Sequence, residues 1–162
     1  MLFRSLRHFG LSNVVEATRK WSANIAACAH LVRPFPEVAR LLAELNRVPS
    51  GARLGIVTSR MREEYDGDFI SHGLHPLFST VICADDTERH KPAPDPLLAY
   101  LERSGAEKGD AIYIGDSGYD MDCAVAAGVD CGHALWGAER GRHPGATYHF
   151  ASVAELRDLL FS

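Results

Sequence analysis

The sequence predicts an α/β protein built on a doubly wound, mainly parallel sheet. From about residue 34 onward, short apolar runs alternate with helical segments. Strands separated by helices of about ten or more residues form βαβ units, which build parallel sheets. The length of 162 residues suits one domain, and 46% hydrophobic with 23% charged residues is ordinary for a globular chain.

The first half of this region alternates a helix, a strand, a helix and a strand. Phe35-Pro36-Glu37 opens a helix with an i, i+3, i+4, i+7 apolar stripe, formed by Val38, Leu41, Leu42 and Leu45. Residues 54–58 form a short apolar run typical of a strand buried on both faces. A polar helix is predicted from about residue 60 to 72, and a second strand at 80–83.

The second half continues the alternation. Asp95 caps a helix with Pro96 at its first position and Gly105 after its end. A capping box of Ser152 and Glu155 begins the last helix. Between them we expect a strand at 111–114, a helix from about Gly118 to Gly128, and strands near 131–136 and 148–150.

The first 33 residues have a different composition. They hold five basic side chains but only one acidic one, Glu16. This composition is that of a mitochondrial transit peptide, and it is also that of an amphipathic helix with a basic face. The helical interpretation is favoured because apolar residues recur at helical spacing, at Trp21, Ile25, Cys28 and Val32.

Charge and cysteine content restrict the class of protein. The net charge is −4 with no basic block, which argues against nucleic-acid binding. No stretch approaches the ~18 apolar residues of a membrane helix. The four cysteines show no metal-binding or disulfide spacing, so we expect reduced core residues in a cytoplasmic protein; they are Cys28, Cys83, Cys123 and Cys131.

Polar side chains follow three of the predicted strands, where parallel sheets bind ligands. Thr58 and Ser59 close the first strand, Lys91 lies in the loop after the second, and Asp116 follows the third, with Asp120 one helical turn on. Each has a structural alternative: Thr58 as a cap, Lys91 as a solvated loop residue, and Asp116 as a helix N-cap. Together they predict a phosphate site, in which Thr58, Ser59 and Lys91 bind the phosphoryl oxygens.

The two carboxylates, Asp116 and Asp120, repel each other mildly at i, i+4. A Mg²⁺ ion shared with a phosphate would relieve that repulsion, so Mg²⁺ is the predicted cofactor. Other candidates are weaker. His72 and His75 have poor metal-ligand spacing, and His133 is expected to be a satisfied core histidine. The pair Asp85-Asp86 is interpreted as loop.

Three motifs in order resemble the haloacid dehalogenase-like hydrolases, near their phosphoglycolate-phosphatase-like branch. They are the strand ending in Thr58-Ser59, the sequence Lys91-Pro92-Ala93-Pro94-Asp95, and Gly115-Asp116-Ser117-Gly118-Tyr119-Asp120. The resemblance implies a Mg²⁺-dependent phosphatase of a small phosphorylated metabolite, with Lys91 and Thr58 in catalysis. It also implies a helical cap remnant at 1–33 and a Rossmann-like core at 34–162.

The chain departs from that family in one respect: it has no Asp-x-Asp-Gly-Thr motif, and its first aspartate is Asp66. The expectation is therefore a truncated phosphatase, weakly active or inactive as this chain. The alternative is a non-catalytic remnant that binds a phosphorylated ligand or a protein partner. A receiver domain is disfavoured because the order of Thr58, Lys91 and Asp116 differs from its pattern.

The family's first strand would lie between the strands that end at Thr58 and Asp116. We expect something to fill that position: residues 1–6, a strand from another chain, or direct pairing of the two flanking strands. An exposed slot there would also favour a homodimer.

Overall fold

The computed structural model describes residues 13–28, 31–48, 52–68, 72–137 and 141–162. The chain divides into two compact units, Met1–Pro34 and Phe35–Ser162. This division lies one residue from the boundary predicted from composition. None of the helices in the described ranges has the length and apolar content needed to cross a bilayer.

The first unit contains helix α2 (Val14–Cys28). The Asn13 side chain accepts a hydrogen bond from the backbone N–H of Glu16 at 3.0 Å, which caps the helix start. Cys28 is exposed and unpaired with another cysteine, so its prediction as a core residue is wrong. Val32 is also exposed. The side chains of Trp21 and Ile25, and residues 1–12, lie outside the described residues.

The second unit has the predicted order of helices and strands. Its main elements are α3 (Pro36–Leu45), β1 (Leu54–Val57), α4 (Arg62–Asp68), β2 (Phe78–Ile82), α5 (Asp95–Ser104), β3 (Ile112–Gly115), α6 (Gly118–Ala127), β4 (Asp130–Ala134), β5 (Tyr148–Phe150) and α7 (Val153–Leu160). Three 3₁₀ helices, η3 (His75–Leu77), η4 (Ala84–Asp86) and η5 (Lys108–Asp110), lie in the connections.

Helix starts differ in detail from the prediction. Pro94 is the N-cap of α5, and Asp95 is its first helical residue. At α7, the Ser152 side chain accepts from the Glu155 backbone at 3.3 Å, but the Glu155 carboxylate binds the N–H of Ala151 at 2.8 Å. The reciprocal half of the predicted capping box is therefore shifted by one residue.

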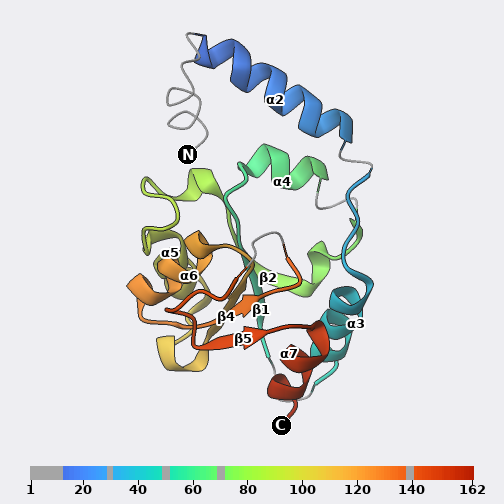
Figure 1. Cartoon of the computed structure of the whole chain (residues 1–162), viewed down its shortest axis with the longest axis vertical. Coiled ribbons are helices and arrows are strands. Elements are labelled where there is room, and N and C mark those ends of the chain that lie inside the picture. The colour runs from blue at the N-terminus through green and yellow to red at the C-terminus, as the bar shows by residue number, and fades with distance from the viewer. Residues whose placement is uncertain (1–12, 29–30, 49–51, 69–71, 138–140) are drawn as a thin grey trace. The chain divides into compact units, whose positions relative to one another are not determined.

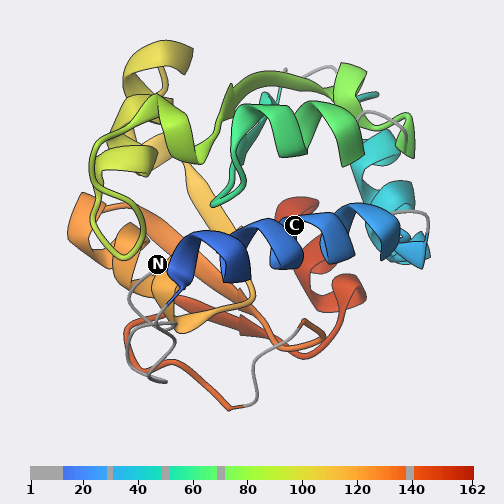
Figure 2. The ribbon, with the colours of Figure 1, turned by 90° about the horizontal axis from the view of Figure 1, so that it is seen from above.

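Every strand pair in the described residues is parallel, which confirms the predicted fold class. The strands form two sheets, β1–β2 and β3–β4–β5. In Figures 1 and 2, α5 and α6 lie on one side of the strands, and α3 and α7 lie on the other.

Two apolar clusters hold these layers together. One joins α5 and α6 to the sheets and includes Met121, Cys123 and Cys131, with Val57 and Tyr113 packed against it. The other joins α3 and α7 to the opposite face, with Leu54 of β1 and Ile114 of β3 packed against it. Both clusters therefore contact both sheets. Three of the four cysteines are buried as predicted.

The position between β1 and β3 contains no paired strand among the described residues. In the described ranges β1 pairs with β2 and β3 with β4, and β1 and β3 do not pair with each other, so the alternative of direct pairing between the flanking strands is wrong. Residues 1–6 lie outside the described residues, and a strand from another chain stays a prediction. The side chains of Lys91 and Tyr113 instead lie against the backbone carbonyl of Val57 on this edge of β1.

Candidate functional site

The candidate site lies at the carboxyl ends of β1 and β3. Thr58 follows β1, and its backbone N–H donates to the carbonyl of Ile82 on β2 at 2.9 Å. The Thr58 hydroxyl is half-buried and accepts from the backbone N–H of Arg60 at 3.2 Å, while Ser59 is exposed. The structural alternative for Thr58, a local cap, is thus also present.

The carbonyl of Val57 belongs to the same peptide unit as the Thr58 N–H and points to the opposite side of the strand. It accepts a hydrogen bond from Lys91 Nζ at 3.0 Å, and it lies 3.1 Å from the Tyr113 hydroxyl, which donates its one proton either here or to Asp120 Oδ1. Because Tyr113 lies on β3, these contacts connect the two sheets directly. They also cover a backbone acceptor on the free edge of β1.

Lys91 is buried, unlike an ordinary loop lysine. Its ammonium group binds Val57 O, the Tyr113 hydroxyl at 2.7 Å and Asp120 Oδ1 at 2.7 Å. A buried lysine needs a partner of opposite charge, and Asp120 supplies it. The Lys91 ammonium group therefore lies between the ends of β1 and β3.

Asp120 has two sets of partners. Its Oδ1 accepts from Lys91 and lies 3.0 Å from the Tyr113 hydroxyl, while its Oδ2 accepts from the Ser117 hydroxyl at 2.6 Å and the Ser117 N–H at 3.2 Å. Burial by itself raises the pKa of Asp120, but the charge of Lys91 and these hydrogen bonds outweigh it and hold the pKa below its ordinary value. These contacts make Asp120 the partner of Lys91, and its role as a metal ligand stays a prediction.

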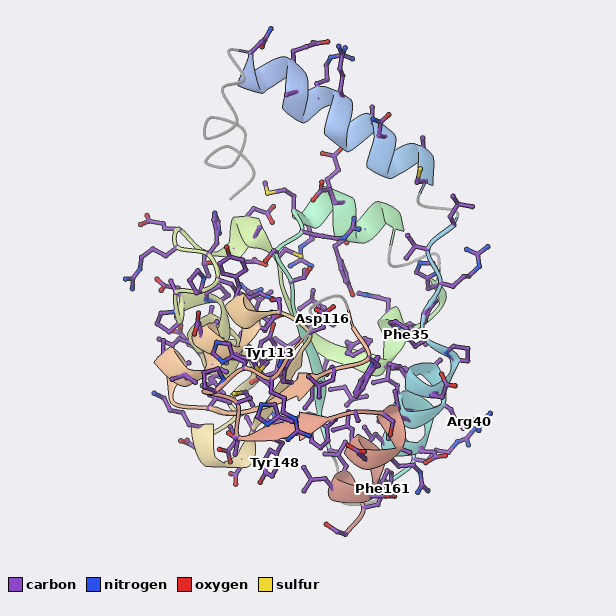
Figure 3. All side chains as sticks on the ribbon, in the orientation of Figure 1. Phe35, Arg40, Tyr113, Asp116, Tyr148 and Phe161 are labelled. Atoms are coloured by element: carbon purple, nitrogen blue, oxygen red, sulfur yellow. The ribbon has the colours of Figure 1, made fainter. Side chains whose placement is uncertain are left out.

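Two glycines allow the acidic side chains to lie where they do. A Cβ on Gly115 would come within 2.4 Å of Asp120 Cβ, and one on Gly137 within 2.2 Å of Asp116 Cβ. The loop after β4 therefore packs directly on Asp116. Tyr113 lies within β3 and Asp116 follows its last residue; both are labelled in Figure 3.

Two contributors to the site, Ser117 and Tyr113, were given no role in the prediction from the sequence. Ser117 is the N-cap of α6 and forms a capping box with Asp120; the Ser-x-x-Asp spacing before a helix is a readable signal for it. Tyr113 has only a weak signal, a hydroxyl within a buried strand. Burial, followed by the charge of Asp120 and the hydrogen bond to it, raises the pKa of Tyr113 well above its ordinary value, so the hydroxyl stays protonated.

The weaker candidates His75 and Asp86 make contacts with side chains outside the candidate site. His75 Nδ1 lies 2.8 Å from the Tyr65 hydroxyl. Asp86 binds Arg62 at 2.8 Å and Arg103 at 3.3 Å, and it lies in the 3₁₀ helix η4 and not in a loop.

His133 is buried as predicted, and its Nδ1 accepts from the backbone N–H of His143 at 3.2 Å. Its Nε2, however, has no hydrogen-bond partner among the described residues, so the expectation of a fully satisfied histidine is half wrong. In the described ranges, no group of three or more His, Cys, Asp or Glu side chains is arranged to hold a metal ion.

Comparison with known proteins assigns this arrangement to a family. The family model described as haloacid dehalogenase-like hydrolase matches residues 2–134. The chain belongs to the haloacid dehalogenase-like hydrolases. This confirms the family that the three sequence motifs resemble.

Relatives in this family carry phosphatase names. The chain is 31% identical to pyrophosphatase PpaX of Halalkalibacterium halodurans over 133 residues, covering 80% of this chain and 61% of the relative. It is 30% identical to phosphoglycolate phosphatase of Yersinia pestis over 126 residues, covering 78% and 53%. The chain therefore spans about half to three fifths of the length of these two relatives.

A solved structure agrees with the fold. The crystal structure of a HAD phosphatase from Thermococcus onnurineus matches with a TM-score of 0.73 and 30% identity, covering 86% of this chain and 64% of that one. The crystal structure of CbbY from Rhodobacter sphaeroides in complex with phosphate matches with a TM-score of 0.75 at 23% identity, covering 88% and 65%.

Proposed function

We propose that this chain binds the phosphoryl group of a small phosphorylated metabolite, as the phosphate-holding part of a phosphatase of its family. The observation that carries the proposal is the buried Lys91 ammonium, held by Asp120 and Val57 O between the carboxyl ends of β1 and β3. Thr58 and Ser59 lie at the end of the same strand as Val57, and their hydroxyls would bind further phosphoryl oxygens. The phosphatase names of the relatives support the substrate class.

The residues fit a Mg²⁺ ion only when a phosphate shares it. Mg²⁺ commonly takes one or two carboxylates together with phosphate oxygens and water. Asp116 would supply a carboxylate, whereas Asp120 is already bound by Lys91, Tyr113 and Ser117. Bound there, the ion would supply charge neutralisation at the phosphoryl oxygens. We therefore assign Asp116 to the metal and Asp120 to Lys91.

The residues of this chain bind and orient the ester, but they do not supply a nucleophile. Phosphoryl transfer in the resembled family begins at an aspartate of the Asp-x-Asp-Gly-Thr motif, which these 162 residues do not contain. The carboxylate nearest to Lys91, Asp120, is held in an ion pair and a capping box. We propose that the chain by itself binds phosphate with little or no turnover, as a cytoplasmic protein.

The test is binding of inorganic phosphate, measured by isothermal titration calorimetry with and without Mg²⁺. We expect binding by the wild type and none by Lys91→Met. Lys108→Met is the matched control, because Lys108 lies in η5, before β3, at the opposite end of that strand. Equal binding by both variants would contradict the proposal.

A turnover assay distinguishes a catalytically active phosphatase from a non-catalytic chain that only binds phosphate. We expect no hydrolysis of p-nitrophenyl phosphate by the wild-type chain with Mg²⁺, which favours a binding role for the chain alone. Hydrolysis that is lost in Asp116→Ala would instead establish a complete phosphatase and refute the non-catalytic alternative.

A further inference from the structure

The hydroxyl of Tyr113 accepts a hydrogen bond from the Lys91 ammonium group, on which the proposed phosphate site depends. A lysine has three N–H donors and no acceptor. All three donors of Lys91 have partners, Val57 O at 3.0 Å, the Tyr113 hydroxyl at 2.7 Å and Asp120 Oδ1 at 2.7 Å. A phosphoryl oxygen can therefore bind Lys91 Nζ only by replacing one of these acceptors.

The three acceptors differ in how readily a phosphate replaces them. Asp120 is the partner of opposite charge, and charge-assisted hydrogen bonds are the stronger ones. Val57 O is a backbone acceptor on the free edge of β1 that would need another donor. The Tyr113 hydroxyl is neutral, and it keeps its own donated hydrogen bond, to Val57 O at 3.1 Å or Asp120 Oδ1 at 3.0 Å, after Lys91 leaves.

We propose that Tyr113 is a positioning residue that holds the Lys91 ammonium against the strand ends and sets the affinity of the site for phosphate. The inference rests on the proposed phosphate site. When phosphate binds, one N–H of Lys91 passes from the Tyr113 hydroxyl to a phosphoryl oxygen. The hydroxyl thus orders Lys91 in the free protein and competes with phosphate for it.

The test is the affinity of Tyr113→Phe for inorganic phosphate, measured by titration calorimetry on the full chain. Removing the hydroxyl frees one donor of Lys91, so we expect phosphate to bind about tenfold more tightly, the order expected for one hydrogen bond to a charged group. A purely structural role for Tyr113 would lower the affinity or leave it unchanged. Tyr148→Phe is the control, because Tyr148 is partly exposed on β5 and stacks on Phe150.

A second measurement needs no variant at Tyr113. In the wild type with ¹³C-labelled tyrosine, we expect phosphate to shift the ring signal of Tyr113, and we expect no shift in Lys91→Met. Equal or weaker binding by Tyr113→Phe, or a Tyr113 signal that ignores phosphate in the wild type, would overturn the role of Tyr113 and leave the phosphate site standing. Absence of phosphate binding by both the wild type and Tyr113→Phe would overturn both.

Discussion

The two edges of the β1–β2 sheet are covered by cationic side chains in different ways. On the outer edge, the carbonyl of Val81 accepts from Arg62 at 3.1 Å and Arg103 at 3.2 Å, and both arginines bind Asp86. On the inner edge, facing β3, the carbonyl of Val57 accepts from Lys91 and lies within hydrogen-bond distance of the Tyr113 hydroxyl. On each edge, a cationic side chain that is paired with an aspartate donates a hydrogen bond to a backbone carbonyl.

The two groups of charged side chains, the inner cluster (Lys91 and Asp120) and the outer cluster (Arg62, Arg103 and Asp86), differ in burial. Lys91 and Asp120 side chains are 9% and 10% exposed, whereas Arg62, Arg103 and Asp86 are 36%, 50% and 21% exposed. A half-exposed pair contributes little free energy, because water and salt screen it. A buried pair is costly to break, so losing one partner of the Lys91–Asp120 pair should cost more stability than losing one partner of the Arg62–Asp86–Arg103 group.

The largest effect is expected for Lys91→Met, which leaves the Asp120 carboxylate buried without its charge partner. The free energy of unfolding in urea should fall by about 3–5 kcal/mol. Arg89→Met is the exposed control, because the Arg89 side chain is 71% exposed in its ion pair with Asp95. Its loss should stay below about 1 kcal/mol.

The double variant Lys91→Met with Asp120→Leu sharpens this result. Removing both charges eliminates the unpaired buried ion, so the double variant should be more stable than Lys91→Met alone. If the two single losses simply added in the double variant, the two side chains would not act as a buried pair.

Gly115→Ala tests the close approach of Asp120 to the end of β3. A Cβ at this position would come within 2.4 Å of Asp120 Cβ and 2.9 Å of Asp120 Oδ2. Crowding of this kind costs about 1–3 kcal/mol of unfolding free energy. Gly109→Ala is the matched control, because a Cβ there meets nothing within 4 Å. Equal stability of both variants would refute the packing of Asp120 against Gly115.

Lowering the pH should reduce the stabilisation from Asp120 more than the stabilisation from Asp86, because Asp120 is the more buried of the two. Burial raises the pKa of both Asp120 and Asp86, but other contacts outweigh it and hold both pKa values below the ordinary value. For Asp120 the main such contact is with Lys91. For Asp86 they are the Cys83 N–H and the two arginines. A carboxylate with a lowered folded pKa stabilises the protein above its unfolded pKa of about 3.9, and that contribution is lost as the pH falls through the folded pKa.

The comparison is made by urea unfolding from neutral pH down to about pH 2. The stability difference between wild type and Asp120→Asn should shrink as the pH falls, and by more than the difference for Asp86→Asn. A constant difference across this range would show that the Asp120 charge contributes nothing to stability.

The smallest effect is expected for Arg103→Met on the outer edge. Asp86 and Val81 O keep Arg62 as a partner, so the loss in unfolding free energy should be at most about 1 kcal/mol. The loss should also decrease in high salt, because half-exposed charges are screened. A loss as large as that of Lys91→Met would remove the distinction between the two edges.

Sequence periodicity predicted the alternation of strands and helices, because buried parallel strands are short apolar runs and helices bury one stripe. It also placed Thr58, Lys91 and Asp116 after strand ends, which is a consequence of topology. It could not predict the ion pair of Asp120 with Lys91, since i, i+4 spacing of carboxylates does not reveal which one turns toward a lysine 29 residues away in the chain. Tyr113 and the Val57 carbonyl were also out of reach, because their contact depends on how two separate sheets face each other.

The most direct test of this account is a map of backbone amide shifts in ¹⁵N NMR during titration with inorganic phosphate. A phosphate site at the ends of β1 and β3 predicts shifts that centre on Thr58, Lys91 and Asp116 and that vanish in Lys91→Met. Shifts centred on Asp86 and Arg103, or shifts that persist unchanged in Lys91→Met, would contradict it.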